Sequence, residues 1–217
     1  MLRAAIFDMD GVMIDSHPIH KKTWRKFLKF LGKEITEENL NFVMDGRKRE
    51  EILRHFLGDL SDEEVRLLGH QKEQLFRDEA ADIKVIEGLQ DFLTQLSEAE
   101  IKLGVASSGS ESRVNYVLDS FHLRHYFEAI VTGDQVTIGK PDPTIFRLAC
   151  NRLRVRPTET LVFEDSVSGV RAAKAADMRC VGVATNGITA NLLEAGADHI
   201  IPDFSCVSVD LVRDLFE

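Results

Sequence analysis

The sequence predicts an α/β protein in which a doubly wound parallel sheet carries a small helical domain inserted after its first strand. Three observations predict this fold. A short apolar run at residues 3–7 ends on two acids, Asp8 and Asp10, followed by Gly11. A long polar stretch with apolar residues at helical spacing comes next, and beyond it short apolar segments alternate with amphipathic ones. Such alternation is typical of parallel strands joined by right-handed helical crossovers.

The opening run is short and apolar enough to be a buried strand, which places Asp8 at its carboxyl end. Open α/β sheets bind their ligands at that end of their strands. Taken alone, Asp8-Met9-Asp10-Gly11 is also typical of an ordinary turn, because turns select Asp and Gly. The functional interpretation therefore depends on later segments of the chain.

The stretch from about Ser16 to Asp82 predicts helices, because its apolar residues recur every three or four positions. These residues are Trp24, Phe27, Leu28 and Leu31, then Ile52, Leu53, Phe56 and Leu57, then Leu67, Leu68, Leu75 and Phe76. The stretch contains no convincing strand. We therefore expect a sheet domain made of residues 1–15 and 83–217 and a helical domain made of residues 16–82.

The rest of the chain predicts five further strands, which with the opening run make a six-stranded sheet. The expected strands are Lys102–Ala106, Ala129–Thr132, Thr160–Glu164, Cys180–Ala184 and Asp198–Ile201. The expected helices are Leu89–Ser97, Glu111–Ser120, Pro143–Arg152, Val167–Ala176, Thr189–Ala195 and Val207–Phe216.

Composition and charge disfavour several classes of function. The chain has 217 residues and a formal net charge of −9, which argues against binding to nucleic acid. No apolar stretch approaches the roughly 18 residues of a membrane-spanning helix, and early acids interrupt the apolar region that a secretory signal needs. Three isolated cysteines, Cys150, Cys180 and Cys206, are typical of a reducing compartment. We therefore expect a cytoplasmic protein with no membrane partner.

Four polar segments each follow an expected strand, and we expect them to meet in one site. They are Asp8-Met9-Asp10, Ser107-Ser108-Gly109-Ser110, Gly139-Lys140-Pro141-Asp142-Pro143 and Glu164-Asp165-Ser166. The preference of turns for such residues does not by itself explain this shared position.

This set of residues predicts phosphoryl transfer with Asp8 as the nucleophile. A carboxylate approaches a phosphate dianion only where positive charge offsets the repulsion, and Mg²⁺ on hard oxygen ligands commonly supplies it. Asp8 and Asp165, with Glu164 nearby, offer such oxygens. Lys140 would neutralise the remaining charge, and Ser107 with the amides that follow it would hold phosphoryl oxygens.

Asp10 is the candidate acid–base group. A second carboxyl close to the first can give a proton to the leaving oxygen and later take one from water or an alcohol. A helix or turn cap is the ordinary alternative for Asp10. The three later segments favour the catalytic interpretation.

The same four motifs resemble those of the haloacid dehalogenase superfamily of phosphohydrolases. The resemblance extends over the whole chain, with residues 16–82 similar to that superfamily's small α-helical cap. It implies a Rossmann-like core, an aspartyl-phosphate intermediate, bound Mg²⁺ and a cap that closes over the substrate. On this basis the metal ligands are Asp8, Asp10, Glu164 and Asp165, and the phosphate-binding residues are Ser107, Ser108 and Lys140.

Two segments of the helical domain resemble, more narrowly, β-phosphoglucomutase and its phosphatase relatives. They are Asp15-Ser16-x-Pro18-x-His20-x-x-x-Trp24 and Gly46-x-x-Arg49-Glu50. The resemblance implies that His20, Trp24, Gly46 and Arg49 contact the substrate. His20 would orient Asp10 or a substrate hydroxyl, and Arg49 would bind a second anionic group. A solvent-facing position is the alternative for His20 and Arg49.

Departures from the mutase pattern favour a phosphatase. A mutase holds a bisphosphate that turns around, so both ends of its site bind anions and the phosphoenzyme is kept from water. Asp45 stands where the sugar mutases carry a lysine, and Ser108-Gly109-Ser110-Glu111 lacks the lysine and asparagine of their distal phosphate site. Arg47 and Lys48 are candidate substitutes. We expect a monomeric phosphatase acting on a small phosphorylated metabolite, with a sugar phosphate mutase as the alternative.

Other classes fit less well. A haloacid dehalogenase needs neither a metal nor an acid at Asp10, and a phosphonate hydrolase needs a cap lysine, for which Lys21, Lys22 and Lys72 are the candidates. A phospho-acceptor domain shares the strand-end aspartate, Mg²⁺ and lysine, but it needs neither Asp10 nor a cap. An inactive binding relative is disfavoured because all four motifs are intact.

Overall fold

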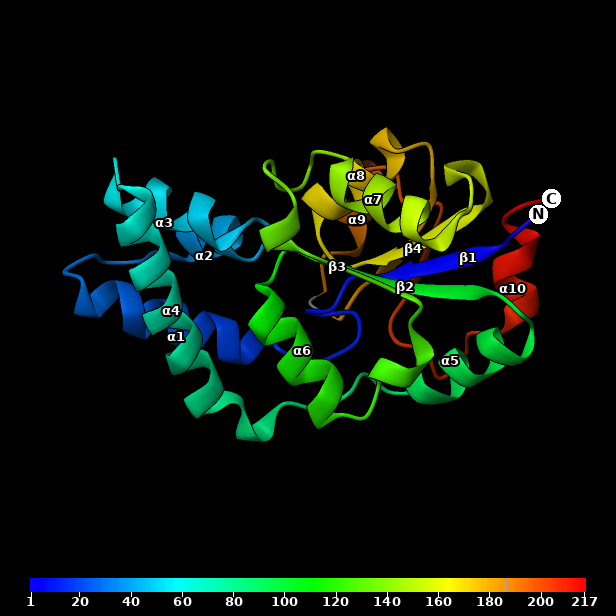
Figure 1. Ribbon diagram of the computed structural model, residues 1–217, viewed down its shortest axis with the longest axis horizontal. Coiled ribbons are helices and arrows are strands. Elements are labelled where there is room, and N and C mark those ends of the chain that lie inside the picture. Colours follow the sequence, from blue (N-terminus) through cyan, green and yellow to red (C-terminus); the bar gives the residue numbers. More distant parts are fainter. Residues whose placement is uncertain (186) are drawn as a thin grey trace.

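The structure, a computed structural model that describes residues 1–185 and 187–217, has a six-stranded sheet at its centre (Figure 1). The strand order is β3-β2-β1-β4-β5-β6, and every neighbouring pair is parallel. The strands are β1 (Ala4–Phe7), β2 (Lys102–Ser107), β3 (Ala129–Thr132), β4 (Thr160–Glu164), β5 (Arg179–Val183) and β6 (His199–Ile201). The predicted doubly wound fold is confirmed, with β1 at the point where the strand order reverses.

Helices cover both faces of the sheet (Figure 1). The helices α5 (Leu89–Glu98), α6 (Glu111–Ser120) and α10 (Val209–Asp214) pack on one face, while α7 (Thr144–Leu153), α8 (Val167–Ala175) and α9 (Thr189–Glu194) pack on the other. Both faces of β1 are therefore buried: Ala5 and Phe7 join the first core cluster, and Ala4 and Ile6 join the second. A strand covered on both sides reads as a continuous apolar run rather than an alternating one.

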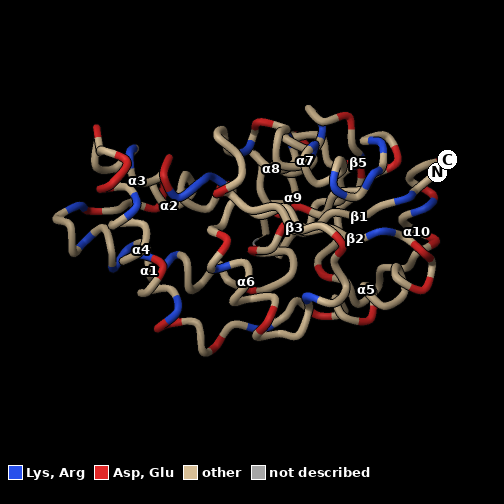
Figure 2. The backbone as a smooth tube through the Cα atoms, viewed as in Figure 1, with Lys and Arg blue, Asp and Glu red and all other residues tan. Residues whose placement is uncertain are grey.

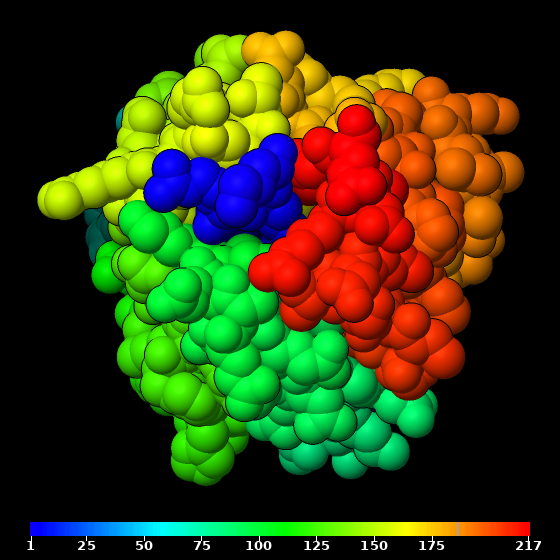
Figure 3. Space-filling model, turned by 90° about the vertical axis from the view of Figure 1, so that its right-hand side faces the viewer, coloured from blue at the N-terminus to red at the C-terminus, as the bar shows by residue number. Residues whose placement is uncertain are grey.

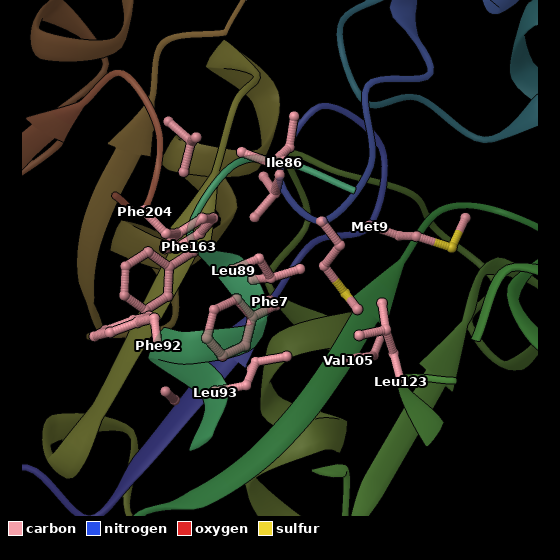
Figure 4. Packing of buried hydrophobic residues seen from close by; sticks show 14 of the residues in the cluster. Phe7, Met9, Ile86, Leu89, Phe92, Leu93, Val105, Leu123, Phe163 and Phe204 are labelled. Carbon is pink, nitrogen blue, oxygen red and sulfur yellow. The ribbon is translucent and has the colours of Figure 1, made fainter. Parts of the chain in front are cut away.

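Aromatic rings fill the first of these cores. Phe7 stacks on Phe163 of β4 with ring centroids 4.7 Å apart, and Phe92 of α5 stacks on Phe204 at 5.6 Å. Figure 4 shows these rings between α5 and the sheet, with Met9 at the end of the cluster. This packing fixes the carboxyl end of β1, from which Asp8 extends.

Residues 16–82, which we call the insert, form helices, as predicted. They are α1 (His17–Phe30), α2 (Glu37–Val43), α3 (Arg49–Leu57), α4 (Asp62–Glu79) and the short 3₁₀ helix Ala80–Asp82. No residue of this stretch, which the structure describes throughout, lies in a strand. The insert has its own core, to which Trp24, Phe27, Ile52 and Leu53 belong. Leu67 departs from the predicted apolar pattern, because its side chain is exposed to solvent.

Two chain segments connect the insert to the sheet domain, and they lie side by side. Ile14 forms an antiparallel bridge with Val85, and hydrogen bonds flank it, from Asp15 N to Lys84 O at 2.9 Å and from Ile86 N to Met13 O at 3.0 Å. The outgoing and returning connections are therefore held together. The exact domain boundaries stay a prediction.

The other element boundaries lie close to the predicted ones. β3, β4 and α6 span the expected residues, and β5 is shifted by one residue toward the N-terminus. The last helix, α10, is shorter than expected at both ends and begins after Ser208, whose hydroxyl accepts a hydrogen bond from Leu211 N at 3.2 Å. A side-chain cap of this kind satisfies an amide that the helix itself leaves unpaired and so defines the first turn.

Charged residues of both signs are spread along the insert and the sheet domain (Figure 2). The two chain ends lie next to each other on the face of the molecule opposite the insert (Figures 1 and 3). Among the described residues, no helix combines the length and the apolar character needed to cross a lipid bilayer.

Asp198, just before β6, allows a test of stability against pH. It accepts hydrogen bonds from Lys174 at 2.7 Å, Arg179 at 3.1 Å and the backbone of Cys180 at 2.8 Å. Burial raises the pKa of Asp198, but these donors outweigh it and hold the pKa below its usual value. A lowered folded-state pKa stabilises the fold above the unfolded pKa, and the stabilisation is lost as pH falls through the folded value.

We expect Asp198→Asn to lower the free energy of unfolding by about 1 kcal/mol at pH 7. The difference from the parent chain should begin to shrink as pH falls below about 4, where Asp198 becomes protonated in the unfolded state, and it should disappear below the lowered pKa of the folded state. Urea unfolding between pH 3 and pH 7 would measure this, with exposed Asp210→Asn as the control. A difference that is as large at the lowest pH as at pH 7 would contradict the assignment.

Candidate active site

The segments predicted to meet do so at the carboxyl edge of the sheet, under the insert. Asp8 directly follows β1, and its backbone N–H donates to Phe163 O at 3.0 Å, which continues the pairing with β4. Ser107 is the last residue of β2, is buried, and accepts from Gly109 N at 3.1 Å. Lys140 reaches the same point from the loop before α7 and donates to Asp8 Oδ1 at 2.6 Å.

Lys140 is buried and interacts with two carboxylates. Besides Asp8, its ammonium donates to Glu164 Oε1 and to Ala106 O at 3.3 Å. Burial lowers the pKa of Lys140, but the charges of Asp8 and Glu164 outweigh burial and raise it above its usual value. Lys140 is therefore a permanent cation beside the candidate nucleophile.

Glu164, which the sequence suggested as a metal ligand, has both oxygens engaged. Oε1 binds Lys140, while Oε2 accepts from Asp165 N at 2.9 Å, Ser166 N at 3.0 Å and Ser166 Oγ at 2.9 Å. These bonds join the lysine to the turn that begins α8. Gly169 makes room for this arrangement, because a Cβ at that position would overlap the Glu164 carboxyl group.

Asp8, Asp10 and Asp165 are the carboxylates that the sheet domain contributes to the pocket lining. Burial raises the pKa of Asp8 well above its usual value; Lys140 opposes this shift, and the charges of Glu164, Asp165 and Asp10 add to it. Burial likewise raises the pKa of Asp165, to about 6, against the influence of His17. The mutual repulsion of these acids means that a cation between them would be strongly attracted.

The residues present fit a magnesium ion. Among the described residues, no group of three or more His, Cys, Asp or Glu side chains is arranged to hold a metal on its own. Mg²⁺ does not require one, because it keeps several waters and binds through one or two carboxylates plus the phosphate of a substrate. Gly11, with φ of +75°, lets the loop after β1 approach so closely that a Cβ there would overlap Asp165 and His17. His17 Nε2 lies 2.7 Å from Asp165 Oδ2, so a cation would compete with this bond.

Asp10 is surrounded by donors. Its Oδ1 accepts from Ser16 Oγ at 2.7 Å and from Arg113 Nη1 at 2.7 Å, and His20 Nε2 lies 3.1 Å away. Burial raises the pKa of Asp10, but Arg113 and His20 outweigh it and hold the pKa well below its usual value. The predicted contact between His20 and Asp10 is present, and Arg113 adds a partner that the sequence did not predict.

The protonation of His20 follows from its two neighbours. Asp10 is ionised and can only accept, so Nε2, which lies 3.1 Å from it, carries the ring proton, and Nδ1 is left to accept from Lys72 Nζ at 3.1 Å. Burial and the charge of Lys72 lower the pKa of His20 to about 3, which keeps the ring neutral. Burial and Arg113 also lower the pKa of Lys72, to about 7. Lys72 thus fixes the orientation of His20.

The insert side of the pocket is rich in cations. Arg47, Arg49 and Lys72 line it, together with Glu73, while Arg113 of α6 lines the pocket from the sheet domain. Glu73 lies 3.9 Å from both Arg49 and Arg113 and accepts from Ser110 Oγ at 3.4 Å. The cavity between insert and sheet domain measures about 80 Å³. Most ligand sites are several times larger, about 300–1,000 Å³, so a sugar-sized ligand would fit only with the insert displaced.

The other predicted insert residues also lie at this boundary. Trp24 is buried in the insert core and lines the pocket, with Lys72 Nζ 4.9 Å from its ring centroid. Gly46, also in the pocket lining, accepts at its carbonyl from Ser108 Oγ at 2.6 Å. The hydroxyl of Ser108, predicted to bind phosphate, therefore holds the insert in this arrangement.

The residues at positions 45–48 also bind the sheet domain. Asp45 accepts from Ser168 N at 3.0 Å and Ser168 Oγ at 2.5 Å, in the first turn of α8. Arg47 faces Asp45 at 3.6 Å, and Lys48 Nζ donates to Val136 O at 2.6 Å. Position 45 thus carries a helix-capping acid, which explains physically why a lysine is absent there.

Sequence reasoning missed Arg113, Glu73 and His17, and it considered Lys72 only for a different chemistry. Of these residues, only Arg113 could have been noticed from the sequence, because of its position in a helix. Arg113 is the third residue of α6, and the amino end of a helix favours anions over cations. An arginine in that turn is expected only where a nearby carboxylate holds it, as Asp10 does here.

The chain belongs to the haloacid dehalogenase-like hydrolases, whose family model matches residues 5–183. Among its relatives is the phosphorylated carbohydrates phosphatase of Thermotoga maritima, which is 35% identical over 92% of this chain and 94% of its own length. The crystal structure of β-phosphoglucomutase from Clostridium difficile superposes with a TM-score of 0.88 at 26% identity, covering 100% of this chain and 97% of that one. CbbY from Rhodobacter sphaeroides, in a complex with xylulose-(1,5)bisphosphate, gives 0.79 at 27% identity and covers 94% and 95%.

We expect Lys140→Met to destabilise the fold by about 3–5 kcal/mol at pH 7, because Asp8 and Glu164 then remain buried without their counter-charge. Urea unfolding measures this directly. The control is Lys22→Met, which breaks an exposed pair with Glu79 and should cost less than about 1 kcal/mol. Equal losses in the two variants would show that Lys140 does not hold the site together.

Proposed function

We propose that this chain is a Mg²⁺-dependent phosphatase that hydrolyses a small phosphate ester, a sugar phosphate or a similar metabolite, through an aspartyl-phosphate on Asp8. The observation that carries the proposal is the placement of Asp8 at 2.6 Å from the buried ammonium of Lys140, at the floor of a pocket that also contains Asp10. The family and the carbohydrate phosphatase relative support the same reaction class. Action as a monomer in the cytoplasm stays a prediction.

In the first half-reaction, Asp8 attacks phosphorus while Lys140 and the amides after Ser107 stabilise the phosphoryl oxygens. Mg²⁺, held by Asp8 and Asp165 with Asp10 as a further candidate ligand, would offset the repulsion between the carboxylate and the phosphate dianion. Glu164 acts through Lys140, which it fixes by a direct hydrogen bond. Asp10 is the candidate donor of the proton to the leaving alcohol; Arg113 and His20 favour its ionised form, which is the form that its second role, as a base, requires.

In the second half-reaction, Asp10 takes a proton from water as the water attacks the phosphoenzyme. Ser16 and His20 orient the carboxyl group for both steps, and Lys72 holds His20 in the required tautomer. The same carboxyl group therefore serves as the acid in the first step and as the base in the second step of the displacement.

A sugar phosphate mutase is the alternative, and the contacts at positions 45–48 disfavour it. A second phosphate site needs free cations there, but Asp45 binds Ser168 and Lys48 is bonded to Val136 O. Arg49 and Arg47 are the cations left for a substrate, since Arg113 is bonded to Asp10. They suit one further anionic or polar group on a substrate better than a bisphosphate that turns around.

The first test measures phosphate release from a panel of phosphate esters with Mg²⁺ and with EDTA. We expect release that EDTA abolishes, and we expect Asp8→Asn to reduce turnover to background in a chain that still folds, as shown by a cooperative thermal unfolding transition. A parallel reaction with β-glucose 1-phosphate and a trace of glucose 1,6-bisphosphate tests the mutase. Glucose 6-phosphate without free phosphate would establish the alternative, and full activity of Asp8→Asn would refute both.

The role of Arg49 is tested with a pair of substrates. Arg49→Ala should raise KM for an ester with a second anionic group by about tenfold, the effect of one lost charged hydrogen bond of about 1.4 kcal/mol. KM for p-nitrophenyl phosphate should change little. Arg54→Ala, an insert arginine paired with Asp62, is the matched control. Equal changes for both substrates would remove Arg49 from substrate recognition.

A further inference from the structure

We propose that Arg113 is a positioning residue that holds Asp10 over the phosphoenzyme from the sheet-domain side of the site, independently of the insert. The proposal rests on the phosphatase function proposed above and adds to it a residue that the motifs do not include. Its consequence is that water can discharge the phosphoenzyme when the insert has moved away.

The contact itself is short and buried. Arg113 Nη1 donates to Asp10 Oδ1 at 2.7 Å, and the arginine side chain is 9% exposed. Nη1 also lies 3.0 Å from His20 Nε2, but that nitrogen carries the ring proton, so the guanidinium hydrogen is directed at Asp10. Asp10 therefore receives one bond from Arg113 and another from His20 on the same oxygen.

The partners of Asp10 belong to different parts of the molecule. Ser16 and His20 belong to the insert, and His20 depends in turn on Lys72 of α4. Arg113 belongs to α6, which packs on the sheet through Val114, Val117 and Leu118. Arg113 also lies 3.9 Å from Glu73 and over the ring of Phe76, both in α4, and movement of the insert would remove these two contacts. Its bond to Asp10 joins two parts of the sheet domain and need not break with them.

The loop before α6 is shaped for this arginine. A Cβ on Gly109 would overlap Nη2 of Arg113, so glycine provides the space that the guanidinium fills. The backbone N–H of Arg113 donates to Ser110 Oγ at 3.3 Å, which fixes the first turn of the helix. Two neighbouring residues thus direct one side chain toward Asp10.

Insert movement is required by the size of the pocket. A cavity of about 80 Å³ does not hold a sugar phosphate together with the waters it needs. When the insert moves to admit a substrate or release a product, His20 and Lys72 move with it. Arg113 is then the charged partner that stays with Asp10.

The step that Arg113 supports is the second displacement. A water oxygen forms a bond to phosphorus, the bond from phosphorus to the Asp8 oxygen breaks with its electron pair returning to Asp8, and the water proton passes to Asp10. The products are inorganic phosphate and free enzyme. Misplacing the base by about 1 Å can slow such a step about 10²-fold, so a residue that fixes its position affects the rate without touching the reacting atoms.

The experiment measures the lifetime of the phosphoenzyme. The protein with Mg²⁺ is loaded from acetyl phosphate, whose leaving group needs no acid, and the aspartyl-phosphate is followed by acid quench. We expect Arg113→Met to lengthen its lifetime about 10–100-fold while its rate of formation changes less than about threefold. Arg113→Lys should restore part of the loss, and added ethylguanidinium should shorten the lifetime in a smaller variant, Arg113→Ala.

A matched control separates this role from a structural one. Arg77→Met removes another arginine that bonds α6, through Ser112, but that does not contact Asp10. Its phosphoenzyme lifetime should equal that of the parent chain. If Arg113→Met does not fold, as judged by its thermal unfolding, the lysine and alanine variants carry the test.

A double variant tests independence from the insert. His20→Ala and Arg113→Met should each lengthen the lifetime, and together they should approach the effect of Asp10→Ala. No further change on adding Arg113→Met to His20→Ala would show that Arg113 acts only through His20 and would overturn the proposal. So would an unchanged lifetime in Arg113→Met, or a change confined to KM for substrates with a second anion, which would make Arg113 a substrate ligand.

The two proposals fail in different ways. If the parent chain forms no phosphoenzyme and releases no phosphate from any ester, the proposed function is wrong and this inference falls with it. If the parent chain turns over and Arg113 variants discharge the phosphoenzyme at the parent rate, only the positioning role is wrong.

Discussion

The buried interaction of Lys140 with Asp8 and Glu164 is the constraint on which the rest of the site depends. An ammonium and two carboxylates removed from water are each unfavourable alone and are tolerated only as a set. Glu164 extends this set into the turn before α8, since its second oxygen accepts three hydrogen bonds there. The ends of β1 and β4 and the loop before α7 are therefore fixed by one charge cluster.

Around this cluster the two domains contribute different kinds of side chain to the site. The sheet domain supplies Asp8, Asp10, Asp165 and Lys140, and the insert supplies cationic and aromatic side chains together with Glu73. Asp10 accepts hydrogen bonds from both domains, so the set of its partners depends on how the two domains are placed. Asp45, Gly46 and Lys48 bond directly to the sheet domain and so hold the insert against it.

The fold was predictable because its strands and helices leave local patterns of apolar residues in the sequence. Strands buried on both faces appear as short apolar runs, and β3 and β4 were placed to the residue. Asp8, Lys140 and Asp165 were predictable because each follows a strand or a turn signal. Arg113 and Glu73 were not, because their meeting depends on how α4 of the insert lies against α6, which no local pattern encodes. The prediction that Leu67 belongs to an apolar helix face was wrong for the same reason, since helical spacing does not show which face of a helix packs against another element.

The paired connections at Ile14 and Val85 have a mechanical consequence. A domain tethered by one flexible linker can rotate freely, whereas two antiparallel segments held by backbone hydrogen bonds permit rocking about one line and resist twisting. The insert would then open along a single path, and each closure would return His20 and Arg49 to the same register with the sheet domain. In the proposed reaction, the positions of the reacting groups would then depend on these paired connections as much as on the residues that line the pocket.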